Sequence, residues 1–307
     1  MPIKLPHLTS LAACVLGSIA TSSNATITIT DGQVTFTMRN GTFTGGAWAA
    51  DLFTHPGSPD HLFRNQWYYR TQSQIMEHQL SSDNNTDEGA VGSEGFIEWS
   101  ESGFDFRLDV SIGPALSGDQ IANVNQGMSV INTSAQTQTI HLFNYSDFEF
   151  GGFLSSNFAS RDAYGIEVTN PNIAGTVGRI ETGALGVQPI HWQIDDGFVI
   201  LDELDDALVT TLTDSNNQSF DDTSAVLEFV VTVEPGETVV VGDSLQIVQS
   251  PFSADLTQDG EVNFFDVSLF LSQFANGQRG ADFTNDGLFN FFDIAAFVSA
   301  YSRDANP

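Results

Sequence analysis

Two twelve-residue stretches near the carboxyl terminus place oxygen-bearing side chains at the same spacing. DLTQDGEVNFFD begins at Asp255, DFTNDGLFNFFD begins at Asp282, and each has glycine at position 6. Calcium takes about six to eight oxygen ligands, and such a loop supplies them from positions 1, 3, 5, 7, 9 and 12 around a glycine turn. The spacing therefore predicts two calcium ions, with position 7 contributing its backbone carbonyl. The predicted ligands are Asp255, Thr257, Asp259, Glu261, Asn263 and Asp266 in the first loop, and Asp282, Thr284, Asp286, Leu288, Asn290 and Asp293 in the second.

The side chain at position 3 of each loop is unusual. Thr257 and Thr284 are neutral, where aspartate or asparagine is the more common ligand. A hydroxyl donates less charge to the ion, so the substitution predicts a reduced calcium affinity. A competing interpretation treats the aspartates as caps of helix starts, which they favour. It leaves the repeated glycine and the repeated oxygen spacing unexplained.

Each loop runs into an apolar stretch with helical spacing. The pattern therefore predicts a loop followed by one helix, twice over. The apolar positions are Val267, Phe270, Leu271 and Phe274 in the first copy, and Ile294, Phe297, Val298 and Tyr301 in the second.

Two loop–helix units of this kind resemble a type I dockerin, and the resemblance covers Asp255 to about Tyr301. It implies a small all-α calcium-binding module over residues 251–307, with two roughly antiparallel helices. It also implies a cohesin-like partner or another surface scaffold, because dockerins attach secreted proteins, often polysaccharide-degrading enzymes, to such assemblies. The repeated FFD triplets are similar to those of planctomycete-type dockerin repeats.

The residues at positions 10 and 11 depart from the cellulosomal pattern. Cellulosomal dockerins tend to have small hydroxyl residues there, whereas this chain has Phe264-Phe265 and Phe291-Phe292. We expect one phenylalanine of each pair to pack in the core and the other to be an exposed partner-binding anchor. The near-identity of the copies predicts pseudo-two-fold symmetry, and hence two docking orientations.

The charge of the chain limits its partners. The net charge is −30, with 9 Lys plus Arg against 39 Asp plus Glu. A basic patch cannot form, so nucleic acid and anionic membrane surfaces are poor partners, and we expect no nucleic acid to bind. Cations remain, and a solubility adaptation to concentrated salt is the alternative explanation of the overall charge.

The first 25 residues have the pattern of a signal peptide. Lys4 precedes the apolar run Leu11 to Ala20, and Ser23-Asn24-Ala25 is a small-x-Ala cleavage site. Cys14 also lies in a sequence similar to a bacterial lipoprotein box, so lipidation is an alternative. No later segment is long and apolar enough to span a bilayer. We therefore expect a protein secreted by a bacterium or held at its surface, with no transmembrane segment in the mature chain.

Residues 26–250 are predicted to form an antiparallel β-sandwich of unknown function, which makes the fold mainly β. Short alternating stretches separated by Gly, Asn and Asp recur throughout this region. The predicted strands are 26–30, 33–38, 65–72, 95–102, 104–112, 128–132, 139–150, 197–201, 225–233 and 237–242. The phrases NQWYYR, INTSAQTQTIHLFNYSDFEF, HWQIDD and VEPGE resemble an uncharacterised family of secreted bacterial β-proteins, many with PEP-CTERM sorting tails. That resemblance implies an exported location more than any particular chemistry.

Residues that could make the sandwich an enzyme or a glycan binder are few. His55, Asp60 and His61 share one loop and could form a metal or acid–base site. Trp67, Tyr68 and Tyr69 could form a sugar-stacking platform, with Trp67 and Tyr69 on one face and Tyr68 on the other. The alternative is that at least one of these faces packs in the core. We assign no catalytic residue; if the chain is an enzyme, hydrolysis of glycosidic bonds is the first hypothesis.

The function that these observations favour is attachment. We expect an exported calcium-binding protein, fixed to an extracellular or cell-surface assembly by the C-terminal dockerin-like module. The alternative is a polysaccharide-degrading enzyme or glycan-binding module that the same module delivers.

Overall fold

The structure is a computed structural model, and it describes most of the residues that follow the expected signal peptide. It describes residues 26–40, 48–54, 56, 58, 60–81, 84–113, 120–150, 157–161, 165–170, 176–182, 187–215, 217–220, 222–249, 254, 256–257, 261–278, 281, 283 and 289–304. The predicted signal peptide, residues 1–25, lies outside these ranges. Among the described helices, none combines the length and hydropathy needed to cross a bilayer.

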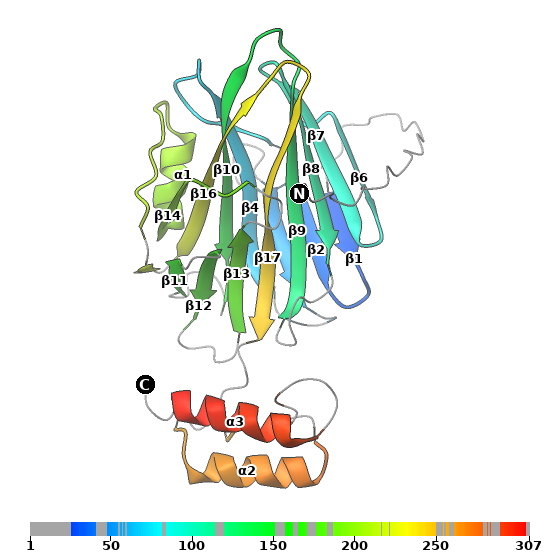
Figure 1. The fold of residues 1–307 in the computed structure, drawn as a ribbon, viewed down its shortest axis with the longest axis vertical. Helices are drawn as coiled ribbons and strands as arrows, with labels where there is room; N and C mark the ends of the chain where they lie inside the picture. The colour runs from blue at the N-terminus through cyan, green and yellow to red at the C-terminus, as the bar shows by residue number, and fades with distance from the viewer. Residues whose placement is uncertain are drawn as a thin grey trace, which may run out of the picture.

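Two antiparallel sheets lie face to face, as the sandwich prediction required (Figure 1). Within the described ranges the first sheet has eight strands, in the order β1-β2-β3-β4-β10-β16-β14, with β5 paired to β4. These strands are β1 (Thr26–Thr30), β2 (Thr35–Asn40), β3 (Trp48–Phe53), β4 (Leu62–Thr71), β5 (His78–Gln79), β10 (Gln138–Phe148), β14 (His191–Asp196) and β16 (Thr223–Val233).

The second sheet has nine strands in the described ranges, in the order β15-β11-β12-β13-β17-β9-β8-β7-β6. These strands are β6 (Asp87–Val91), β7 (Glu94–Glu101), β8 (Phe104–Ile112), β9 (Gln120–Asn132), β11 (Asn157–Arg161), β12 (Gly165–Thr169), β13 (Thr176–Thr182), β15 (Asn217–Phe220) and β17 (Thr238–Gln249). Strands β6 and β15 lie in Asn- and Asp-rich stretches that composition alone favours as loops.

The hydrophobic core lies between the sheets because side chains alternate along each strand. On β10, Ile140 and Leu142 point into the core, so His141 points to the outer face of the first sheet. Leu227 and Phe229 on β16 alternate with Glu228 in the same way. Each strand of the first sheet therefore presents a second row of side chains away from the core.

Helix α1 (Gly197–Asp205) corrects the prediction of a strand over residues 197–201. The β-branched and aromatic residues of GFVIL favour a strand, but the Asp196 carboxylate accepts a hydrogen bond from the Phe198 amide and caps a helix. Ile200 and Leu204, one turn apart, then pack on the outer face of the first sheet. Tertiary burial of that pair outweighs local strand propensity.

The C-terminal region contains helices α2 (Phe264–Ala275) and α3 (Phe291–Asp304). They have a hydrophobic cluster of their own, in which Phe270 stacks on Phe297 with ring centroids 4.1 Å apart. Phe274, late in α2, meets Phe289, just before α3, at 6.3 Å. The two helices therefore run antiparallel, side by side and beyond one end of the sheets (Figure 1).

Candidate functional site

The first predicted calcium loop ends in a buried, firmly held carboxylate. Asp266 is 0% exposed and lies in the first turn of α2. Its Oδ1 accepts hydrogen bonds from the amide and the hydroxyl of Thr257, both at 2.9 Å, and its Oδ2 accepts from the Asn263 amide at 2.8 Å. Asp266 therefore ties positions 3, 9 and 12 of the loop together.

The second loop repeats this geometry at its own helix start. Asp293 is 0% exposed, and its Oδ2 accepts from the Asn290 amide at 2.8 Å. Asn290 Oδ1 in turn accepts from the Phe292 amide at 2.8 Å, and Asn263 Oδ1 accepts from the Phe265 amide at the same distance. Positions 9 and 12 thus have one arrangement in both copies, as the sequence repeat predicts.

The electrostatics of Asp266 favour its charged form. Burial raises the pKa of the carboxyl, but hydrogen bonds from the Asn263 and Thr257 backbone amides and the Thr257 hydroxyl outweigh burial and leave the pKa below its ordinary value. Asp266 is therefore an anion at neutral pH, and it is buried. In the described part of the chain, its hydrogen-bond donors are neutral groups.

Some of the remaining predicted calcium ligands are among the residues that the structure describes, and the others are not. Asp255, Asp259, Asp282, Thr284, Asp286 and Leu288 lie outside the described residues. The Glu261 carbonyl, predicted at position 7, accepts a hydrogen bond from Asn263 Nδ2 at 3.3 Å. Among the described residues alone, no group of three His, Cys, Asp or Glu side chains could hold a metal ion. The described donors at positions 3, 7, 9 and 12 all present oxygen, the ligand atom that calcium requires.

All four phenylalanines of the FF pairs are exposed, which corrects the prediction that one of each pair packs in the core. Phe264, Phe265, Phe291 and Phe292 are 74%, 67%, 72% and 68% exposed. Both pairs begin their helices, and the core-facing side of each helix starts one residue later, at the buried aspartate. Ring centroids within the pairs are 6.3 and 6.4 Å apart, at the same 65° angle.

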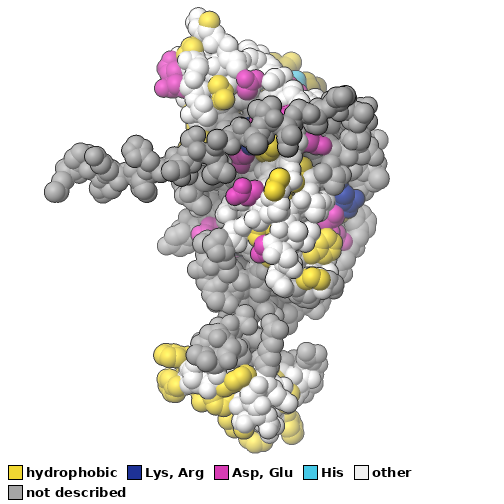
Figure 2. Space-filling model, turned by 90° about the vertical axis from the view of Figure 1, so that its right-hand side faces the viewer, with side chains coloured by type: hydrophobic (Ala, Val, Ile, Leu, Met, Phe, Trp, Pro, Cys, Tyr) yellow, Lys and Arg dark blue, Asp and Glu magenta, His cyan; other side chains and the backbone are white. Residues whose placement is uncertain are grey.

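Because α2 and α3 are antiparallel, the two aromatic pairs lie at opposite ends of the helix pair. Figure 2 shows hydrophobic side chains gathered on the outside of this C-terminal region. Four exposed aromatic rings are an unusual apolar surface for a chain with a net charge of −30.

Of the three residues of the predicted metal or acid–base site, Asp60 and His61 are described, whereas His55 lies outside the described residues, so this site stays a prediction. His61 is buried, with its ring centroid 5.7 Å from that of Phe150. Asp60 Oδ1 accepts from the Leu52 amide at 2.8 Å and the Leu62 amide at 3.2 Å, and burial raises its pKa to about 7. Asp60 therefore holds its own loop against β3.

The sugar-stacking hypothesis for Trp67 and Tyr69 is wrong, and the core alternative is confirmed. Trp67 and Tyr69 are both 1% exposed and lie between the sheets. Tyr68 points the other way, as alternation predicts, but α1 covers it. None of the three aromatic rings can reach a glycan.

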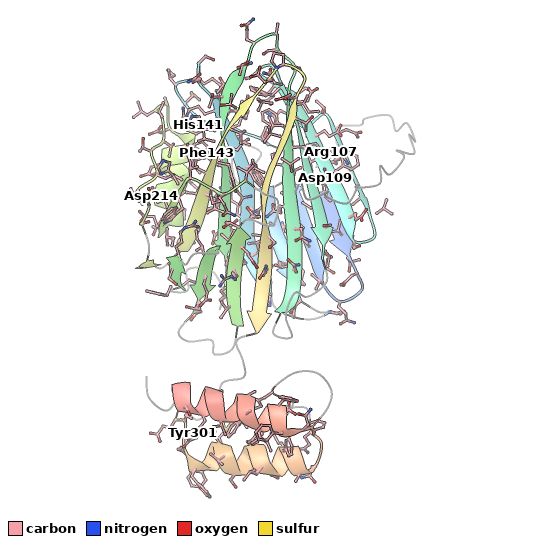
Figure 3. The ribbon with its side chains drawn as sticks, in the orientation of Figure 1. Arg107, Asp109, His141, Phe143, Asp214 and Tyr301 are labelled. Carbon is pink, nitrogen blue, oxygen red and sulfur yellow. The ribbon has the colours of Figure 1, made fainter. Side chains whose placement is uncertain are left out.

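Sequence reasoning missed a row of charged side chains on the outer face of the first sheet. Arg70 on β4 lies opposite His141 on β10, and His141 Nδ1 lies 2.6 Å from Glu228 Oε1 on β16. Arg70 Nε donates to Glu77 Oε1 at 2.9 Å. Figure 3 labels His141 and Phe143, and Phe143 packs in the same hydrophobic cluster as Ile200 and Leu204 of α1. The alternation of apolar and polar residues around His141 is the sequence signal available for this row. It predicts that His141 faces away from the core, but it does not identify the residues that His141 contacts.

Comparison with known proteins yields no family. No protein-family model matches the chain, and no curated protein matches it. Among solved structures, a putative aldose 1-epimerase from Escherichia coli K12 is 9% identical, with a TM-score of 0.44, over 74% of this chain and 100% of that one. A galactose mutarotase-like protein from Lactobacillus casei is 7% identical, with a TM-score of 0.41, over 73% of this chain and 99% of that one. A putative kojibiose phosphorylase from the human microbiome is 10% identical, with a TM-score of 0.41, over 90% of this chain and 35% of that one. At these scores, no activity transfers to this chain.

Proposed function

We propose that the protein is exported and attaches to an extracellular or cell-surface assembly through its C-terminal dockerin-like region, stabilised by two calcium ions. The observation that carries the proposal is the matched pair of buried carboxylates, Asp266 and Asp293, each held by the amide at position 9 of its loop at 2.8 Å. Two carboxylates in equivalent buried positions suit two equivalent cations.

Calcium would supply the positive charge that the described surroundings of Asp266 lack. The ligands in the described residues would be the Thr257 hydroxyl, the Glu261 carbonyl, the Asn263 amide oxygen and the Asp266 carboxylate, with Asn290 and Asp293 in the second loop. The Thr257 hydroxyl donates a hydrogen bond to Asp266, and a hydroxyl oxygen is also an acceptor of the kind that calcium takes as a ligand. Free calcium at about 100 times its dissociation constant would stabilise each site by about 2.7 kcal/mol.

The exposed phenylalanine pairs supply the contact with the partner. A buried aromatic anchor contributes more to binding than most interface residues do, and these rings are not used by the core. A partner with an apolar pocket, a cohesin-like module or another surface scaffold, fits either pair. Their equivalent geometry at opposite ends of the helix pair allows two docking orientations.

The calcium half of the proposal is tested on the mature chain, from Thr26 onwards, after removal of metal with a chelator. Titration calorimetry should give two calcium ions per chain, and Asp266→Ala should remove one of them. The matched control is Asp202→Ala, which removes an exposed carboxylate from α1. Absence of heat in the parent chain, or an equal loss in the control, refutes the calcium sites.

The docking half is tested with envelope proteins of the producing cell. The mature chain should retain a partner in calcium and release it in chelator. Replacing Phe264 and Phe265 by Ser, or Phe291 and Phe292 by Ser, should weaken retention partially, and all four replacements should abolish it. Calcium-dependent retention that survives the fourfold variant excludes the aromatic pairs as the contact.

A further inference from the structure

The outer face of the first sheet brings together three charged side chains from adjacent strands. Tyr69 and Thr71 lie on the core side of β4, so Arg70 lies on the outer face, directly across from His141. Glu228 sits on the next strand, opposite Phe143 in the register and diagonal to His141. Cross-strand and diagonal neighbours of this kind lie within about 5 to 8 Å of one another.

His141 and Glu228 form a close pair that orients the imidazole. The distance between His141 Nδ1 and Glu228 Oε1 is 2.6 Å, and this is the one side-chain hydrogen bond of His141 within the described residues. The Glu228 side chain is 6% exposed and that of His141 is 21% exposed. With Nδ1 turned to the carboxylate, Nε2 points away from it and can donate or accept a hydrogen bond.

Arg70 is held in place by a buried carboxylate. The Glu77 side chain is 0% exposed and accepts from Arg70 Nε at 2.9 Å and from the Thr210 amide at 3.1 Å. A buried ion pair of this kind adds little net stability, because desolvation offsets the attraction. Its effect is to fix the position of the guanidinium of Arg70, the residue paired with His141 in the register of β4 and β10.

The segment that follows α1 frames the same area. Thr210 donates its hydroxyl to the Glu203 carbonyl at 2.7 Å, and Gln193 Nε2 donates to Glu203 Oε2 at 2.9 Å. The Thr213 amide donates to Gln193 Oε1 at 3.2 Å. These bonds tie α1 and its following segment to β14, and the Thr210 amide ties the same segment to Glu77, the partner of Arg70. Such supporting hydrogen bonds hold side chains in a fixed arrangement, which is what a binding site requires.

The charges of the three groups select the class of ligand. Arg70 disfavours a cation, and the carboxylates of Glu77 and Glu228, in a chain with a net charge of −30, disfavour an anion. A guanidinium donates, a carboxylate accepts and an imidazole does either, which suits hydroxyl groups, since these both donate and accept. We propose that Arg70, His141 and Glu228 form a binding site for a neutral, hydroxyl-rich ligand of the sugar class.

The site is tested on the mature chain labelled with carbon-13 at histidine Cε1. Glucose, galactose, mannose and xylose are each added to about 50 mM, a range that detects millimolar binding. The His141 signal, assigned with His141→Gln, should shift and saturate with at least one aldose. Glu228→Gln should weaken that binding about tenfold, since it removes a charge-assisted hydrogen bond.

The control is His61, a buried residue just before β4 whose ring centroid lies 5.7 Å from that of Phe150. Nine residues of extended strand, about 30 Å, separate His61 from Arg70. The His61 signal, assigned in the same way, should not shift. The proposal fails if no aldose shifts the His141 signal saturably, if His61 shifts equally, or if a folded Glu228→Gln variant binds as well as the parent. If Glu228→Gln does not fold, the comparison of His141 with His61 in the parent decides. None of these outcomes depends on the calcium loops.

Discussion

Asp243 is a carboxyl group in the interior of the sandwich, and its neutralisation has a calculable effect. It lies on β17, is 1% exposed, and faces the first sheet across the core. Gln126 Nε2 donates to Asp243 Oδ1 at 3.2 Å, and Trp67 Nε1 donates to Gln126 Oε1 at 3.4 Å. The other oxygen, Oδ2, has no hydrogen-bond partner among the described residues. We predict that Asp243→Asn stabilises the protein above neutral pH.

The magnitude follows from the pKa. Burial raises the pKa of Asp243 from 3.8 to about 7, a difference of about 3 units, which corresponds to about 4 kcal/mol. The folded state binds this proton more tightly than the unfolded chain does. The contribution to stability is therefore complete below pH 3.8 and is lost as the pH rises to about 7. Asparagine has no charge to bury and escapes that loss.

The assay is urea unfolding of parent and variant from pH 4.5 to 8.5, followed by the fluorescence of the buried Trp67 and Trp99. Several other carboxyls also have raised pKa values, so the difference between the two proteins is the informative quantity. That difference should favour Asp243→Asn increasingly up to about pH 7, by about 4 kcal/mol at most, and then level off. A difference independent of pH, or a variant less stable than the parent at pH 8, refutes the reasoning.

Three further predictions concern other parts of the chain. Phe270→Ala removes the ring stacked in the helix pair and should destabilise that pair by about 3 to 5 kcal/mol. The C-terminal region should then be proteolysed faster, while the unfolding transition followed by tryptophan fluorescence stays unchanged. Equal proteolysis of parent and variant would contradict this prediction. Gly197→Ala would place a Cβ 2.7 Å from Ser224 Oγ, and this overpacking should lower the stability measured by thermal unfolding by about 1 to 3 kcal/mol. An unchanged melting temperature would contradict the prediction and would show that α1 shifts to accommodate the methyl group. Asp266→Ala should lower the free energy of unfolding by about 1 kcal/mol even in chelator, because capping hydrogen bonds are lost. An unchanged stability in chelator would contradict this capping role and would leave metal binding as the only role of Asp266.

Local patterns in the sequence determined the fold class of the body and the positions of the two C-terminal helix starts. Alternation of apolar and polar residues predicted the β-rich body and the antiparallel sandwich. Repetition in the last fifty or so residues predicted two equivalent helix starts, and Asn263–Asp266 and Asn290–Asp293 have the same geometry. These features follow from side-chain periodicity and from contacts within a few residues, which sequence records directly.

Tertiary structure decided where local signals conflict or partners are distant. The stretch GFVIL has strand propensity, yet burial of Ile200 and Leu204 on the first sheet makes it part of a helix. Both phenylalanines of each pair are exposed because the core side of each helix begins one residue later. Glu228 meets His141 across 87 residues of chain, and Gln126 meets Asp243 across 117. Strand order and register create those pairs, and neither is encoded in the neighbourhood of any one residue.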